Sequence, residues 1–238
     1  MNYFEKIKNE PLKDKYLKVD LLKEDYLMDK EKGLEIYYAP FDYINKSASV
    51  VIVGITPGWS QMEKSFKTFI SEVNNSSTYS IALRKVKTES SFAGSMRTNL
   101  IKMLDELGLN SKLNLLSCEE LFNTDNELLH STSALKYPVF KNGKNYTGSS
   151  PSPIENEFLW GQIEKNLVDE LSYFEDKLII PLGKNVNNIL TKLESVNKLN
   201  SNCVLRGFPH PSGANGHRAK QFETNKVSMI NKINTWKV

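Results

Sequence analysis

Two short segments of the chain combine residue types that can bind a flat ligand and stabilise negative charge. The first is the turn Gly-Ile-Thr-Pro-Gly at residues 54–58, where two glycines let the backbone approach a flat ligand and Pro57 stiffens the turn. The second contains His210 between Pro209 and Pro211. Because these prolines restrict the backbone, we expect the imidazole to point in a fixed direction, as a preorganised hydrogen-bond donor must. Each segment alone is also compatible with a tight turn or a structural histidine.

Predicted strands position both segments. The uncharged run from Ser49 to Gly54 predicts a strand buried on both faces of a sheet, and open α/β sheets bind ligands where such strands end. Apolar runs predict further strands at residues 113–116, 128–134, 178–183 and 202–205. Helical spacing predicts helices at residues 60–73, 96–107, 155–174 and 217–236, and another after residue 183. This alternation predicts a three-layer α/β/α fold with a central, mostly parallel, four-stranded sheet.

The composition is typical of one globular domain. With 238 residues and a net charge of +3, we expect a single domain over residues 1–238, with residues 1–45 as an N-terminal helical extension packed on it. Cys118 and Cys203 lie far apart, which predicts buried thiols rather than a disulfide or a metal site. No apolar run suits a signal peptide or a membrane span, so we expect a cytoplasmic monomer with no membrane partner.

Several motifs, taken in order, resemble those of the uracil-DNA glycosylase superfamily. Residues 54–58 are similar to the first motif of its mismatch-specific branch, and His210–Asn215 is similar to the last motif. Between them, Ser91–Gly94 and Leu182–Gly183, each with the helix that follows, are similar to segments of the iron–sulfur branch, and residues 136–138 match a third such segment less closely. The resemblance covers residues 49–225. It implies the fold of that superfamily and hydrolysis of an N-glycosidic bond in DNA.

The chain also departs from the family pattern. The cysteines that bind the cluster in the iron–sulfur branch are absent, so we expect no cluster, no metal and no other cofactor. Thr56 stands at the position of the water-positioning Asp or Asn, and its hydroxyl can orient a water but cannot act as a general base. Ser133, or Thr132 if the register shifts, stands where an Asn reads the edge of uracil. These changes favour a substrate other than ordinary uracil, and a carboxylate from elsewhere, Glu63 or Asp42, is left open.

The resemblance implies that His210 and Thr56 act in catalysis. A hydrogen bond from the imidazole to the base would stabilise the negative charge that the leaving base acquires. Phe92 is a candidate stacking platform for the flipped base, although a phenylalanine beside glycine is as often part of a core. The residues expected to bind the base are Gly54, Ile55, Pro57, Gly58, Phe92 and Ser133.

DNA is the expected partner, bound around the last motif. Ala214 stands where related enzymes insert a bulky wedge, so a weak wedge would favour single strands, mispairs or poorly stacked bases. Cationic side chains and free N–H groups at the start of the next helix can bind phosphates. The expected DNA-binding residues are Ser212, Gly213, Ala214, Asn215, His217, Arg218 and Lys220. In the long loop over residues 140–153, Lys141, Lys144 and Tyr146 are candidates for backbone contacts or for covering the base pocket.

The leading hypothesis is a monofunctional DNA glycosylase that removes a damaged or modified base, uracil-like or an enlarged modified pyrimidine, after flipping it out of DNA. Its setting, repair or defence against phage DNA that carries such bases, is left open. The second hypothesis is a non-catalytic module of the same fold that recognises a modified base or DNA. A third, a nucleoside hydrolase or nucleotide-binding protein, is disfavoured because the chain has no Gly-x-Gly-x-x-Gly or Walker pattern.

Overall fold

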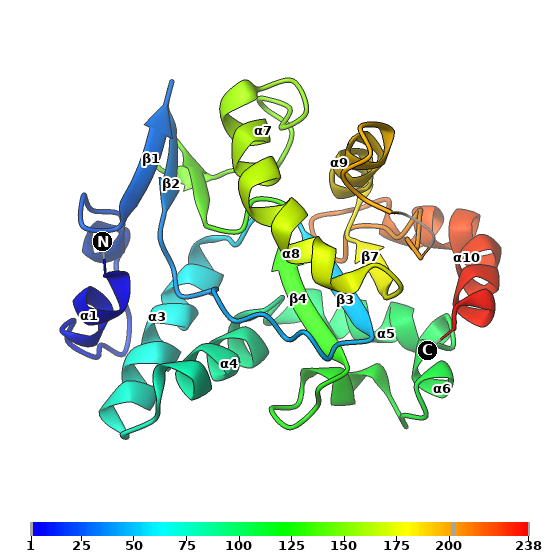
Figure 1. Cartoon of the computed structure of the whole chain (residues 1–238), viewed down its shortest axis with the longest axis horizontal. Coiled ribbons are helices and arrows are strands. Elements are labelled where there is room, and N and C mark those ends of the chain that lie inside the picture. The colour runs from blue at the N-terminus through cyan, green and yellow to red at the C-terminus, as the bar shows by residue number, and fades with distance from the viewer. Residues whose placement is uncertain (1, 201–202, 238) are drawn as a thin grey trace.

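The computed structural model describes residues 2–200 and 203–237 and is organised around one buried strand, β3 (Val50–Gly54) (Figure 1). β3 lies between β4 (Leu129–Ser133) and β7 (Leu178–Pro181), and both pairings are parallel. Every residue of β3 is buried, as expected for an uncharged β-branched run covered on both faces. The strands predicted at these three places are confirmed.

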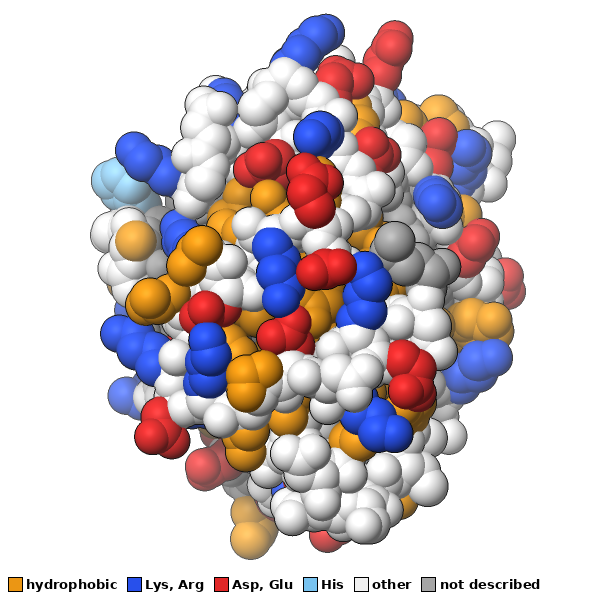
Figure 2. All heavy atoms as spheres, turned by 90° about the vertical axis from the view of Figure 1, so that its left-hand side faces the viewer, with side chains coloured by type: hydrophobic (Ala, Val, Ile, Leu, Met, Phe, Trp, Pro, Cys, Tyr) orange, Lys and Arg blue, Asp and Glu red, His pale blue; other side chains and the backbone are white. Residues whose placement is uncertain are grey.

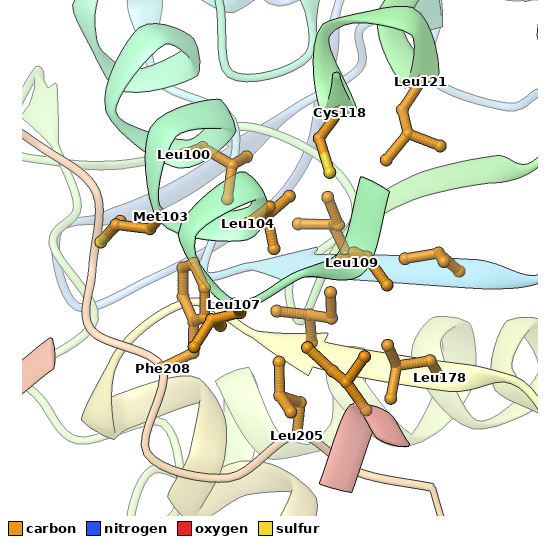
Figure 3. Packing of buried hydrophobic residues seen from close by; sticks show 14 of the residues in the cluster. Leu100, Met103, Leu104, Leu107, Leu109, Cys118, Leu121, Leu178, Leu205 and Phe208 are labelled. Carbon is orange, nitrogen blue, oxygen red and sulfur yellow. The ribbon is translucent and has the colours of Figure 1, made fainter. Parts of the chain in front are cut away.

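Helices cover both faces of this sheet. On one face, α5 (Ser95–Glu106), α6 (Leu109–Lys112) and α10 (Arg218–Thr235) contribute apolar side chains to a single core cluster with the strands. Figure 3 shows leucines of α5 facing Leu178, Leu205 and Phe208, with Cys118 buried close by. The opposite face is covered by α7 (Glu157–Ile163), α8 (Asp169–Leu171) and α9 (Lys184–Ser195). The mixed α/β class is confirmed, and the sheet lies between two layers of helices.

The parallel sheet is smaller than predicted. In place of a fourth strand at residues 202–205, Val204 forms a single parallel bridge with Ile179 of β7. Residues 201–202 lie outside the described part of the chain. The strand predicted at residues 113–116 is wrong, because Leu113 directly follows α6 and its N–H bonds back to Leu109 and Asn110. These local hydrogen bonds keep the segment out of the sheet: Leu113 packs in the core, whereas Leu116 is exposed to solvent.

A second, antiparallel sheet lies beside the parallel one, and the sequence does not predict it. Its order is β1 (Leu27–Glu31), β2 (Leu34–Tyr37), β5 (Val139–Lys141) and β6 (Lys144–Asn145). The N-terminal extension is therefore not wholly helical: two short helices, α1 (Tyr3–Lys8) and α2 (Lys18–Leu21), precede the β1–β2 hairpin. Its aromatic side chains pack on α3 (Trp59–Asn74) and α4 (Tyr79–Ser90).

The face formed by the N-terminal extension carries interspersed acidic and basic side chains (Figure 2). Oppositely charged neighbours pair across it, as Lys6 does with Asp25 at 2.8 Å and Lys13 with Asp20 at 2.9 Å. Because the two signs alternate, this face has no single-sign field that would select a polyanion. Over residues 2–200 and 203–237, no helix combines the length and hydropathy needed to cross a bilayer.

Candidate functional site

The parallel strands end at one edge of the sheet and bring the two motif segments together. Ser133 at the end of β4 lies opposite Gly54, and Pro181 at the end of β7 lies opposite Val53. The loop that carries His210 follows Val204, on the far side of β7. Neighbouring strands lie about 4.8 Å apart, so roughly 15 Å separates Ser133 from this outer loop. The turn at residues 54–58 lies between them.

His210 is held as a neutral hydrogen-bond donor. Its Nδ1 accepts the backbone N–H of Ser212 at 3.2 Å, so the neutral imidazole carries its proton on Nε2. Burial lowers the pKa of His210 below its usual value, which favours this neutral form. Within the described residues Nε2 has no protein partner. The arrangement therefore leaves a half-buried N–H free to meet a ligand atom.

A cavity of about 350 Å³ lies between His210 and the first motif. Its lining comes from Ile55 and Thr147, from the β7–α9 turn and from the His210 loop. The polar side chains around it come from Thr147, Lys184, Asn185, His210, Ser212 and Asn215, and no carboxylate lines it in the described part of the chain. A cavity of this size admits a nucleobase-sized ligand.

The His210 loop is fixed by contacts that the sequence reading did not identify. Gly183 has φ +90°, and a Cβ at this position would lie 3.0 Å from the Cβ of His210. The carbonyl of Pro211 accepts hydrogen bonds from Asn99 at 2.9 Å and from Arg218 at 3.3 Å. Arg218 also donates to the carbonyl of Ser212 at 2.8 Å. Arg218 therefore positions the loop, in addition to its expected place among the DNA-binding residues.

Three of the expected base-binding residues meet beside a smaller recess. A Cβ at Gly54 would lie 3.2 Å from the Phe92 ring and 3.4 Å from the Ser133 hydroxyl, so the absence of a side chain permits this contact. Phe92 is buried and has φ +54°, an unusual backbone conformation for a bulky residue. Pro57 joins Phe92 and Ser133 in lining the recess, which has a volume of about 20 Å³. That space suffices for one water-sized group.

Two residues of the first motif have structural partners. The Thr56 hydroxyl donates to the carbonyl of Tyr137 at 3.0 Å and accepts the N–H of Val139 at 3.1 Å, which ties the motif to β5. Its only proton is thus used within the protein. At Gly58 a Cβ would lie 3.2 Å from the side-chain nitrogen of Asn145, so a side chain from β6 occupies the space beside this glycine.

The two carboxylates left open by the sequence are engaged elsewhere. Asp42 accepts hydrogen bonds from the hydroxyls of Tyr38 at 2.6 Å and Tyr137 at 2.7 Å. Glu63 accepts the N–H of Tyr16 at 2.9 Å and lines a separate groove beside the N-terminal extension. Neither carboxylate borders the cavity at His210. The structure therefore gives no support to either as the group that activates water.

A buried ionic cluster adjoins the recess at the edge strand β4, and two of its members, Lys87 and Lys136, line the recess. Glu170 lies 2.7 Å from His130 and 3.2 Å from Lys136, and both Glu170 and His130 are almost wholly buried. Although burial alone would raise it, the hydrogen bond from His130 and the nearby lysines hold the pKa of Glu170 well below its usual range. Lys87 donates to the carbonyl of Ser131 at 2.8 Å, and burial lowers its pKa to about 8. These residues join α4, β4 and α8 beside the site.

The remaining predicted DNA contacts lie at the rim of the site. Gly213, Ala214, His217 and Lys220 are exposed at the loop tip and the start of α10. In the long loop, by contrast, Tyr146 is buried, so its side chain does not contact DNA. Lys141 is engaged as well, because it donates to the carbonyl of Ser150 at 3.0 Å.

The long loop packs against the first motif and α9. At Gly148, which has φ +83°, a Cβ would lie 2.6 Å from the Ile55 side chain. The carbonyl of Gly148 accepts a hydrogen bond from Asn185 at 2.9 Å. The loop therefore borders the 350 Å³ cavity, where Thr147 forms part of its wall. No group of three His, Cys, Asp or Glu side chains suited to a metal ion occurs among the described residues.

Comparisons with known proteins find similarity to a curated protein and to a solved structure. It is 40% identical over 225 residues to the uncharacterized protein YoxB of Bacillus subtilis, across 92% of this chain and 86% of that protein. Among solved structures, it is similar to the crystal structure of wild-type Pedobacter heparinus SMUG2, with a TM-score of 0.49 and 13% identity over 98% of this chain and 97% of that one. No family model matches the sequence.

Proposed function

The chain belongs to the family of Bacillus subtilis YoxB, and from the geometry of its site we propose that it is a monofunctional DNA glycosylase. Its substrate would be a damaged or modified base, flipped out of DNA into the cavity beside His210. The single observation that carries this proposal is the neutral imidazole, fixed by the Ser212 N–H and lining a cavity shared with the first motif.

His210 would stabilise the leaving base. Breaking the N-glycosidic bond transfers the bonding electrons to the base, and the sugar acquires oxocarbenium character. A donor aimed at the oxygen that gains this charge is preorganised, because its orientation is set by the protein before the reaction starts. Loss of one such donor typically costs about 10²–10³-fold in rate. Because the donor is a neutral imidazole, the hydrogen bond strengthens as negative charge develops on the base.

Water would enter the cavity without help from a carboxylate. Among the polar side chains on the cavity wall, the amide oxygen of Asn185 and the Thr147 hydroxyl would hold it. Thr56 contributes to catalysis by fixing the motif to β5 rather than by donating a proton to this water. The chemistry would therefore depend on the leaving base more than on activation of the nucleophile.

The recess beside Phe92 would limit which bases are accepted. The recess shares no lining residue with the His210 cavity, so Phe92 and Ser133 would contact only a substituent or an exocyclic oxygen of the base that reaches past the first motif. Its volume of about 20 Å³ suits one small polar group. A uracil-like base or a pyrimidine with a small modification fits this limit, and a bulky sugar substituent does not.

DNA would bind along the rim through backbone phosphates. The N-terminus of α9 and the exposed Lys184 border the cavity, and helix N-termini favour anions. At the loop tip, the exposed Ala214 is too small to fill the space left by a flipped base. We therefore expect a preference for single strands or poorly stacked bases.

The second candidate is a non-catalytic reader of the same fold. The observations in its favour are the commitment of the Thr56 proton to Tyr137 and the lack of a carboxylate on the described cavity walls. Such a reader would bind the base in the same cavity and leave the glycosidic bond intact.

Substitutions at His210 distinguish the two candidates. Oligonucleotides with uracil, hypoxanthine, xanthine or hydroxymethylated pyrimidines would be scored for alkali-sensitive sites and, separately, for binding. His210→Ala is expected to lose about 10²–10³-fold in turnover with DNA affinity retained. His210→Gln, whose amide nitrogen reaches the place of Nε2, is expected to retain more turnover than His210→Asn. Turnover by the wild type on none of these bases, with binding intact, would favour the reader.

A further inference from the structure

A second cavity, of about 320 Å³, also has His210 in its wall. Four residues line both cavities: Gly183, Lys184, His210 and Asn215. His210 and its loop therefore border two hollows of similar size. We propose that this second cavity binds the base of the nucleotide that flanks the target on the same DNA strand.

The walls of the second cavity are rich in amide side chains. Asn187, Gln221 and Asn225 line it together with Asn215 and Lys184, and no acidic residue does so in the described part of the chain. Gly207, Phe208 and Pro209 complete the lining with a glycine and two apolar residues. Amides present a donor and an acceptor side by side, which is the pattern that pairs with the edge of a nucleobase.

Existing hydrogen bonds orient these amides and leave part of each one available. The Asn215 amide nitrogen donates to the side-chain oxygen of Gln221 at 3.0 Å, and the Asn225 amide nitrogen donates to the backbone carbonyl of Gln221 at 2.9 Å. Arg206 donates to the side-chain oxygen of Asn187 at 3.2 Å. Among the described residues, the Gln221 amide nitrogen, the Asn225 amide oxygen and the Asn187 amide nitrogen therefore have no protein partner.

The floor of the cavity is built for a close approach. Gly207 has φ +84°, and a Cβ there would lie 2.7 Å from the side-chain carbon of Asn225. Glycine thus allows the Asn225 side chain to lie directly on the loop that leads to His210. The result is a mixed set of donors and acceptors over an apolar base, which suits a neutral heterocycle better than a simple anion or cation.

The residues that the two cavities share point to a neighbouring nucleotide as the ligand. Lys184 and the N-terminus of α9 border both cavities, where the phosphate that links two nucleotides would lie. The tip of the His210 loop ends in the exposed Gly213 and Ala214, which cannot replace a base in a duplex stack. Two adjacent bases can enter separate cavities only if neither is stacked in a duplex, so the ligand is a single strand.

The test measures binding of short single-stranded oligonucleotides by fluorescence anisotropy. Each carries uracil as the target, with either a normal base or a tetrahydrofuran abasic residue on its 5′ or 3′ side. Because a neutral hydrogen bond contributes modestly, removal of the base on the bound side is expected to weaken binding about 3- to 10-fold. In Gln221→Ala and Asn225→Ala this difference should shrink, while Asn231→Ala, an exposed amide on the same helix, should bind as the wild type does.

This inference rests on the proposed function, and turnover measured on the same oligonucleotides separates the two. If oligonucleotides with a base and with an abasic residue beside the target bind equally well on both sides, the second cavity does not bind a flanking base. This conclusion holds even if the protein excises the target base. A neighbour effect that disappears in Gln221→Ala and Asn225→Ala would support the cavity even if no base is excised, in which case the protein is a reader. No affinity for single strands would overturn the second cavity alone, and excision of the target base from mispaired duplexes would then still support the proposed function.

Discussion

Replacement of Gly183 with alanine tests whether the placement of His210 determines turnover. Gly183 has φ +90° and ψ 170°, a region that other residues enter at a cost of about 1–3 kcal/mol. The added methyl group would lie 3.0 Å from the His210 Cβ and 3.4 Å from the His210 backbone nitrogen. Neither atom is the flexible end of a side chain, so the backbone of His210 must shift. A displacement of about 1 Å at a reacting group costs on the order of 10²-fold in rate.

Gly94→Ala is the matched control. Gly94 has φ +81° and ψ −151° and also stands at the start of a helix, but a Cβ there has no neighbour within 4 Å. We therefore expect both variants to lose about 1–3 kcal/mol of unfolding free energy through backbone strain, measured by urea denaturation. Only Gly183→Ala should also lose turnover, by about 10²-fold, in single-turnover excision with enzyme in excess.

The comparison of the two variants can refute the reasoning directly. Equal turnover in Gly183→Ala and Gly94→Ala, under conditions where both are folded, would show that base removal tolerates a displaced imidazole. His210 would then not be the donor. A greater loss in Gly94→Ala would instead place the sensitive contact near Phe92, two residues before it in the chain.

Turnover is expected to fall at a pH below 6.5, the usual histidine pKa, because burial lowers the pKa of His210. The protonated imidazole would carry a hydrogen on Nδ1 that faces the Ser212 N–H, so the bond that orients the ring would be lost. A single-turnover rate that stays constant through the acid range would contradict this. Glu170→Gln is expected to cost about 3–5 kcal/mol of unfolding free energy, because the buried partners of the carboxylate lose their counter-charge. An unchanged midpoint of urea unfolding would show that the negative charge of Glu170 does not stabilise the cluster. Thr56→Val is expected to cost about 1–3 kcal/mol, since two backbone groups lose their partner, whereas Thr56→Ser keeps both bonds. If Thr56→Val keeps the wild-type free energy of unfolding but loses turnover, the hydroxyl acts in the reaction itself and not in stability.

The parallel sheet could be predicted because its strands carry their own signal. Five consecutive buried residues in β3 have no charge, and the apolar stripe of α5 repeats at helical spacing. The antiparallel sheet gives no such signal. β1 reads Leu-Met-Asp-Lys-Glu and has no buried residue, and β6 has two exposed residues. These strands form because the chain crosses back on itself between β2 and β5, a long-range pairing that local propensity does not encode.

The site was only partly visible in the sequence for a related reason. His210 stands out because two prolines flank it, and the structure places it on a cavity wall with Ile55. Thr56 also stands out, yet its hydroxyl bonds to Tyr137 and Val139, which lie more than eighty residues away. Asn99 gives no sequence signal, because nothing in the middle of a helix indicates that this asparagine donates a hydrogen bond to the distant carbonyl of Pro211. The residues that hold His210 in place are set by tertiary contacts, and only His210 itself has a local sequence pattern.

The walls of the His210 cavity restrict the chemistry that the site can perform. In the described part of the chain they carry an imidazole, amides, hydroxyls and one ammonium group, but no carboxylate. In the proposed reaction a carboxylate would stabilise the positive sugar or take a proton from water, so without one the stabilisation would act on the leaving base. A half-buried donor acts there in a lower dielectric than water, which strengthens its interaction with a growing negative charge. If the proposed function holds, such a site would separate substrates by how well the base accepts that charge, and a base whose own substituents withdraw electrons would need the least help from the protein.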